Sequence, residues 1–184
     1  MNFRPLSLPA LLFILALAAT AIIGLRGAYG AQPIDEQARE ELERLYAGSP
    51  GARGLGDKAK AILVIPEIRT AGLIYGEQFG DGVMFLGGEV AGRYRVDGLL
   101  AGYEPGAQSY AYVLFFLSDA ALEKLRHAED WQIGADPGLI VVDAGTGKNL
   151  SRTVQGDVYG VLLDQKPSIG GVVVQGLKIT RTAG

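Results

Sequence analysis

The sequence predicts an α+β fold that is mainly β: an antiparallel β-barrel or strongly coiled sheet of about nine short strands, with about three helices packed on the outside. The first observation is glycine content: the 184 residues include 27 glycines, about twice the usual share of about 7%. The second is their placement between short apolar runs, which is typical of short strands joined by tight turns. A sheet of this size rarely stays flat, because strand twist favours closure.

The N-terminus has the three regions of a secretory signal peptide. Met1–Arg4 is short and positive, Leu6–Leu25 is largely apolar, and Arg26–Ala31 is small and polar. This order predicts cleavage between Gly30 and Ala31.

An uncleaved anchor is the alternative, because the apolar segment is just long enough to span a bilayer. The expected organisation is therefore a signal peptide or anchor over residues 1–30 and one domain over residues 31–184. The domain is expected to be periplasmic or secreted, or anchored to the inner membrane and facing the periplasm.

Two helices are expected before the first strand. Apolar residues at helical spacing predict the first over Gln32–Tyr46, with Asp35 as its N-cap. A break after it is followed by a short helix over Ala52–Lys60. The continuous apolar run Ala61–Ile65 then predicts a buried strand, ended by Pro66.

A meander of short antiparallel strands follows. The turns are expected at Gly80-Asp81-Gly82, Gly87-Gly88 and Asp97-Gly98, because Gly and Asp favour tight turns between apolar runs. The strands so delimited are Leu73–Gln78, Gly82–Leu86, Val90–Val96, Leu99–Tyr103 and Ser109–Leu117.

One more helix and the last strands are expected in the rest of the chain. Ser118 is expected to cap a helix over Asp119–His127. A strand over Trp131–Val142 is interrupted at Asp136-Pro137-Gly138, and the last two strands are expected over Asp157–Leu163 and Gly171–Ile179.

Charge and composition exclude several classes of protein. There are 17 basic and 20 acidic residues, and removal of residues 1–30 leaves 15 and 20, a net charge of −5. This balance argues against a nucleic-acid partner. The absence of cysteine and the single histidine argue against disulfides, thiol chemistry and Cys/His metal sites. No cofactor and no metal are expected.

Few residues could support catalysis. Asp81, Asp136 and Asp143 stand beside glycines at predicted turns, where turn chemistry explains them. His127 falls in the last turn of a helix, where a cation complements the helix dipole. The segment Ala144–Asn149 lacks the glycine and the hydroxyl residue that a phosphate-binding loop requires. The sequence therefore predicts a protein that is not an enzyme.

An ordered set of short motifs runs from Leu55 to Ile179 and resembles the SYLF domain family. The motifs are Lys58–Pro66, Ala71-Gly72, Phe79–Gly82, Gly106–Ser109, Leu122–Leu125, Ile133–Asp136, Val142–Gly145, Ser168–Val172 and Gln175-Gly176. The sequence departs from the family pattern at Ala61, Ile65, Glu77 and Pro167, which are packing and turn positions.

The resemblance implies a β-barrel core and binding of membrane lipid head groups, phosphoinositides in eukaryotic members. In a periplasm the expected partner is another anionic lipid, and actin, which fungal members bind, is not expected. Basic residues around the first strand could meet lipid phosphates. The candidate lipid-binding residues are Arg53, Lys58, Lys60, Arg69 and Lys148.

The leading functional hypothesis is a non-catalytic domain that binds anionic lipid weakly. The alternative is a structural or protein-interaction module of the cell envelope, with an envelope protein as partner and the Asp143–Thr153 loop as contact surface. A small-molecule carrier needs a hollow barrel, which the bulky residues Phe85, Phe115, Phe116 and Trp131 are expected to fill.

Overall fold

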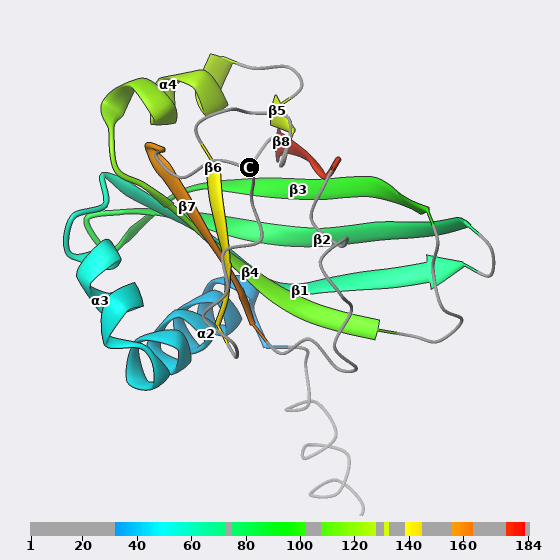
Figure 1. Ribbon diagram of the computed structural model, residues 1–184, viewed down its shortest axis with the longest axis horizontal. Helices are drawn as coiled ribbons and strands as arrows, with labels where there is room; N and C mark the ends of the chain where they lie inside the picture. The colour runs from blue at the N-terminus through cyan, green and yellow to red at the C-terminus, as the bar shows by residue number, and fades with distance from the viewer. Residues whose placement is uncertain are drawn as a thin grey trace, which may run out of the picture. The chain divides into compact units, whose positions relative to one another are not determined.

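A strongly curled half-barrel sheet organises the protein (Figure 1). The computed structural model describes residues 32–72, 75–101, 108–127, 131–132, 139–144, 156–163 and 176–182. In these residues the sheet has eight strands in the order β5-β8-β3-β2-β1-β4-β7-β6. Seven of them pair antiparallel, and β6 is added parallel to β7 at one edge.

Two helices precede the first strand, and a third lies between β4 and β5. The helices are α2 (Ile34–Gly48), α3 (Pro50–Gly56) and α4 (Asp119–His127). The strands are β1 (Ala61–Gly72), β2 (Tyr75–Leu86), β3 (Glu89–Ala101), β4 (Gln108–Phe116), β5 (Trp131–Gln132), β6 (Leu139–Asp143), β7 (Val158–Leu163) and β8 (Lys178–Thr182).

The curl of the sheet gives it a concave and a convex face, each with its own core. The ring centroids of Phe116 on β4 and Trp131 on β5 lie 6.1 Å apart, although four strands separate β4 from β5 in the sheet order. The side of the sheet that carries this contact is therefore concave. Its core includes Leu63, Ile65 and Ile179, all at most 1% exposed.

The convex face is covered at one end by α2 and α3. Ala38 and Leu45 of α2 are buried there against Val64 of β1 and Phe115 of β4. The predicted placement of helices outside the sheet is therefore correct for these two. It is wrong for α4, because its apolar residues, such as Leu122, join the concave core.

Two predicted turns lie inside strands instead. Gly80 and Gly82 belong to β2, and Gly98 belongs to β3, so four predicted strands merge into two long ones. The glycines serve close packing here: a Cβ on Gly80 would stand 2.5 Å from the carbonyl oxygen of Glu67. Only the Gly87-Gly88 turn is confirmed, with φ angles of 56° and 86°.

Pro66 does not end the first strand. β1 continues to Gly72, and its pairing with β2 shifts register between Val64 and Arg69. A bulge of this kind accommodates a proline, which cannot donate a ladder hydrogen bond. Asp35 also differs from prediction: it lies in the first turn of α2, and Pro33 occupies the N-cap position.

Residues Pro33–Gly184 form one compact unit, and both cores draw only on residues of that unit. None of the helices in the described ranges is long and apolar enough to cross a membrane. The predicted signal peptide and its cleavage site lie outside the described residues.

Candidate functional site

Three of the predicted lipid-binding residues lie on the short segment between α2 and β1. We call the segment Pro50–Lys60, which contains α3 and the turn into β1, the α3–β1 corner. Ser49 is the N-cap of α3, and its Oγ accepts a hydrogen bond from the N–H of Ala52 at 3.2 Å. Ala52 is buried against α2 and the convex face, which fixes α3 in place.

Arg53 is held at the surface of the corner by an aromatic ring. Its guanidinium carbon lies 4.8 Å from the ring centroid of Tyr46, and a nitrogen lies 3.7 Å from a carboxylate oxygen of Glu43. Burial and the nearby carboxylates of Asp57 and Glu43 raise the pKa of Tyr46. Gly56 leaves room for the Tyr46 hydroxyl, which a Cβ at that position would overlap.

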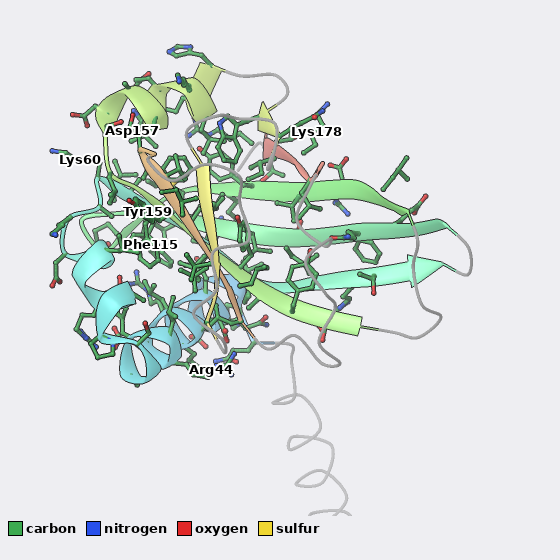
Figure 2. The ribbon with its side chains drawn as sticks, viewed as in Figure 1. Arg44, Lys60, Phe115, Asp157, Tyr159 and Lys178 are labelled. Atoms are coloured by element: carbon green, nitrogen blue, oxygen red, sulfur yellow. The ribbon has the colours of Figure 1, made fainter. Side chains whose placement is uncertain are left out.

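Lys58 and Lys60 are exposed in the turn that enters β1. The N–H of Lys58 donates to Leu55 at 3.1 Å, and that of Lys60 donates to Phe116 of β4 at 2.7 Å. The backbone is thus fixed while both ammonium groups remain at the surface, and Figure 2 shows Lys60 at the edge of the molecule beside the start of β1. Within the described residues neither lysine forms an ion pair.

The other two candidates do not join the corner. Arg69 lies nine residues further along β1, roughly 30 Å away in an extended strand. Its side chain pairs with Glu67 at 2.5 Å, and this hydrogen bond raises the pKa of the Arg69 guanidinium. Lys148 lies outside the described residues. The candidates that share one short exposed segment are therefore Arg53, Lys58 and Lys60.

The corner is not strongly basic as a whole. Asp57 is exposed within it, and Glu43 lies beside Arg53. Two carboxylates thus oppose three cations over a short stretch of surface. Exposed charges of this kind act over a short range and are screened by salt.

A second surface was missed by the sequence analysis. On the convex side, the ends of β1, β2 and β3 remote from α3 extend away from α2 and α3 (Figure 1). We call their exposed outward residues the distal face. They are Glu67 and Arg69 on β1, Glu77, Phe79 and Asp81 on β2, and Arg95, Asp97 and Leu99 on β3.

Two large apolar side chains of the distal face are exposed to solvent. Leu99 is 77% exposed and Phe79 is 36% exposed. The alternation of outward and inward residues along β3 is a detectable signal in the sequence, since Tyr94 and Val96 point into the core and Arg95 and Asp97 do not. The interpretation of Asp97-Gly98 as a turn concealed this alternation.

The concave core contains buried tyrosines. The Tyr110 hydroxyl donates to Oε1 of buried Gln78 at 2.5 Å. The Tyr112 hydroxyl lies over Gly160 and has no hydrogen-bond partner among the described residues. Burial raises the pKa of both tyrosines well above the usual value.

Of the residues considered for catalysis, the described part of the chain places the side chains of Asp81 and His127, which lie on different elements. Asp81 is exposed on the distal face, Asp136 lies outside the described residues, and only the backbone of Asp143 is described, at the end of β6. His127 is exposed on α4, with its Nε2 3.1 Å from Glu123. Within the described ranges no three His, Cys, Asp or Glu side chains are close enough to hold a metal ion.

The predicted filling of the interior is correct for part of the set. Phe116 and Trp131 belong to the concave core, whereas Phe85 and Phe115 belong to the convex core beneath α2. Figure 2 shows Phe115 next to Tyr159 of β7, and both belong to that convex cluster.

Searches with the sequence found no matching family model and no matching curated protein.

Proposed function

We propose that this protein is a non-catalytic, SYLF-like domain of the periplasm or cell exterior that binds anionic lipid head groups weakly through the α3–β1 corner. The observation that carries the proposal is that Arg53, Lys58 and Lys60 are all exposed on one short segment, whose last residue is hydrogen-bonded to β4. The resemblance of the motifs between Leu55 and Ile179 to the SYLF domain family supports it.

The charges of the protein set the strength of this interaction. The net charge of −5 without residues 1–30 repels an anionic membrane at long range, so attraction depends on the local cations. Each lysine or arginine near an anionic surface contributes about 1 kcal/mol, and Asp57 and Glu43 offset part of this. Weak binding that salt abolishes is the expected behaviour.

Liposome flotation of residues Ala31–Gly184 tests the proposal. The protein should float with anionic vesicles and not with neutral ones, and raising the salt concentration should weaken the effect. Lys58→Glu with Lys60→Glu should reduce the floated fraction by at least about tenfold, because the local charge changes by four units.

A control variant separates local from global charge. Lys124→Glu with Arg181→Glu makes the same charge change at exposed positions on α4 and β8. It should float almost as well as the unchanged protein. Equal loss in both variants would show that net charge alone governs binding, and no flotation at low salt would refute the proposal.

The exposed apolar side chains of the distal face favour a second candidate function, a protein-interaction module of the cell envelope. Leu99 on this face is more exposed than any other large apolar residue in the described part of the chain. The sequence had assigned such contacts to the Asp143–Thr153 loop, most of which lies outside the described residues. Cross-linking in cells that recovers one specific envelope protein through this face would favour this function.

A further inference from the structure

We propose that the side chains of Tyr94, Arg126 and Arg181 together bind a phosphate group on the concave side of the sheet. We call these three side chains the Tyr94–Arg181 site. They come from β3, α4 and β8, so the inference is independent of the α3–β1 corner. It rests on the convergence of two guanidinium groups and one hydroxyl, all of which can donate hydrogen bonds to an anion.

The strand register places Arg181 beside Tyr94. Tyr94 on β3 is paired with Arg181 on β8, and Val96 is paired with Ile179. Directly opposite residues of antiparallel strands project to the same side of a sheet, and Tyr94, Val96 and Ile179 all belong to the concave core. Arg181 therefore also projects to the concave side, where it remains exposed.

Gly92 gives the Arg181 side chain room to lie along β3. A Cβ at Gly92 would stand 3.5 Å from Nε of Arg181 and 3.5 Å from Cε2 of Tyr94. One terminal nitrogen of the guanidinium, Nη2, would be 3.7 Å from the same Cβ. The phenol ring and the guanidinium group thus lie side by side over this glycine.

The last turn of α4 supplies the second guanidinium group. Leu122 and Leu125 of α4 are buried in the same core as Tyr94, which holds the helix over this part of the sheet. Burial raises the pKa of the Tyr94 hydroxyl, and the nearby positive charges of Arg181 and Arg126 lower it. Both arginines therefore act on the same hydroxyl group.

The site has more hydrogen-bond donors than acceptors. Among the described residues the Tyr94 hydroxyl has no hydrogen-bond partner, and Arg181 has no ion-pair partner. Arg126 pairs with Oε1 of Glu123 at 2.8 Å, and Oε2 of Glu123 lies 3.1 Å from Nε2 of His127. One carboxylate thus accompanies two guanidinium groups, in a protein whose net charge without residues 1–30 is −5.

A phosphate group matches this set of donors. Guanidinium groups bind phosphate oxygens in pairs through their forked N–H groups. A phosphate monoester carries up to two negative charges and has three terminal oxygens, so it can accept from both arginines and from the Tyr94 hydroxyl. A carboxylate has one charge and two oxygens, which would leave part of the site without an acceptor.

Titration calorimetry of inorganic phosphate into Ala31–Gly184 at low salt tests the inference. Saturable binding of one phosphate per chain is expected. Arg181→Gln should weaken binding by at least about tenfold, because it removes a charged pair of donors. Tyr94→Phe keeps the ring in the core and should also weaken binding, by about tenfold, because it removes a hydrogen bond to a charged group.

A matched control separates the site from the net charge. Arg95→Gln makes the same charge change one residue from Tyr94, on the opposite side of β3, where Arg95 is exposed. This variant should bind phosphate as tightly as the unchanged protein. Equal weakening by Arg95→Gln and Arg181→Gln overturns the proposed site.

Glu123→Gln tests the contribution of Arg126 in the opposite direction. Loss of the carboxylate leaves Arg126 free to meet the phosphate and should tighten binding by about threefold or more. Glu77→Gln, at an exposed position of β2, removes the same charge away from the site and should have little effect. The same gain in both variants would exclude a specific role for Arg126.

Two further results overturn the inference. One is the absence of saturable phosphate binding at low salt. The other is binding of acetate as tight as that of phosphate, which would show that the site does not select a phosphate group. Circular dichroism should show that every variant is folded.

Flotation distinguishes a soluble phosphate compound from a lipid head group. Arg181→Gln and Arg95→Gln should float equally well with anionic vesicles, because both leave the α3–β1 corner unchanged. A loss confined to Arg181→Gln would assign the bound phosphate to a lipid head group, and the corner would then not be the sole lipid contact.

Discussion

At the scale of single residues, two buried tyrosines differ in the hydrogen bonding of their hydroxyl groups. Both lie on β4, two residues apart, and both are at most 2% exposed. The Tyr110 hydroxyl donates to Gln78, whereas the Tyr112 hydroxyl has no partner among the described residues. A buried polar group without a hydrogen bond destabilises the folded state, so the same chemical change should have opposite effects at the two positions.

We predict that Tyr110→Phe lowers the free energy of unfolding by about 1–3 kcal/mol, because Gln78 loses its hydrogen bond to the hydroxyl. Tyr112→Phe should raise it by about 1 kcal/mol, because it removes an unpaired buried hydroxyl. Urea unfolding followed by circular dichroism measures both changes. Loss of stability in Tyr112→Phe comparable to that in Tyr110→Phe would contradict this account of the core.

At the scale of elements, glycines decide how closely β1 and β2 approach. The Cβ of an alanine at position 80 would stand 2.5 Å from the backbone oxygen of Glu67, in the bulged part of β1. Backbone cannot move aside as a flexible side chain can. The bulge around Pro66 and the glycine opposite it therefore form one packing arrangement.

Gly80→Ala should lower the free energy of unfolding by about 1–3 kcal/mol, as overpacking of a filled site does. Gly54→Ala is the matched control, since a Cβ there meets nothing within 4 Å and lies inside α3. It should be neutral or stabilising by about 0.5–1 kcal/mol. Shifts in the urea midpoint at constant slope measure both. The packing argument fails if the two alanines have the same effect.

The elements also show how much the sequence could predict. Apolar periodicity identified the region of α2, the strand at β4 and the helix α4, because burial of one face leaves a local pattern. The turns predicted at Gly80-Asp81-Gly82 and Asp97-Gly98 were wrong, because glycine also occurs inside strands where another backbone approaches closely. That contact is long-range, so no local pattern distinguishes the two.

The candidate site was likewise predictable from the sequence where it depends on local structure, and not where it depends on long-range contacts. Arg53, Lys58 and Lys60 are close in sequence, so their gathering at the α3–β1 corner needs only the local turn. Arg69 was grouped with them because the first strand was expected to end at Pro66, whereas β1 carries it to the opposite end. The distal face combines three strands, and its composition depends on register that the sequence alone does not fix.

At the scale of the whole molecule, net charge and local charge oppose each other. Without residues 1–30 the protein carries a net charge of −5, which repels an anionic surface at a distance. The cations of the α3–β1 corner act only near contact, where Asp57 and Glu43 offset part of their attraction. Lowering the long-range repulsion without changing the corner should therefore strengthen binding.

Removal of two acids remote from the corner tests this balance. Glu77→Gln with Asp81→Asn changes the net charge without residues 1–30 from −5 to −3 at exposed positions of β2 and leaves Arg53, Lys58 and Lys60 unchanged. The variant should float more strongly than the unchanged protein on anionic vesicles at low salt. The two proteins should float equally at physiological salt, where charges further apart than about 8 Å are screened. If the variant gains nothing at low salt, the net charge does not limit binding, and the α3–β1 corner alone determines its strength.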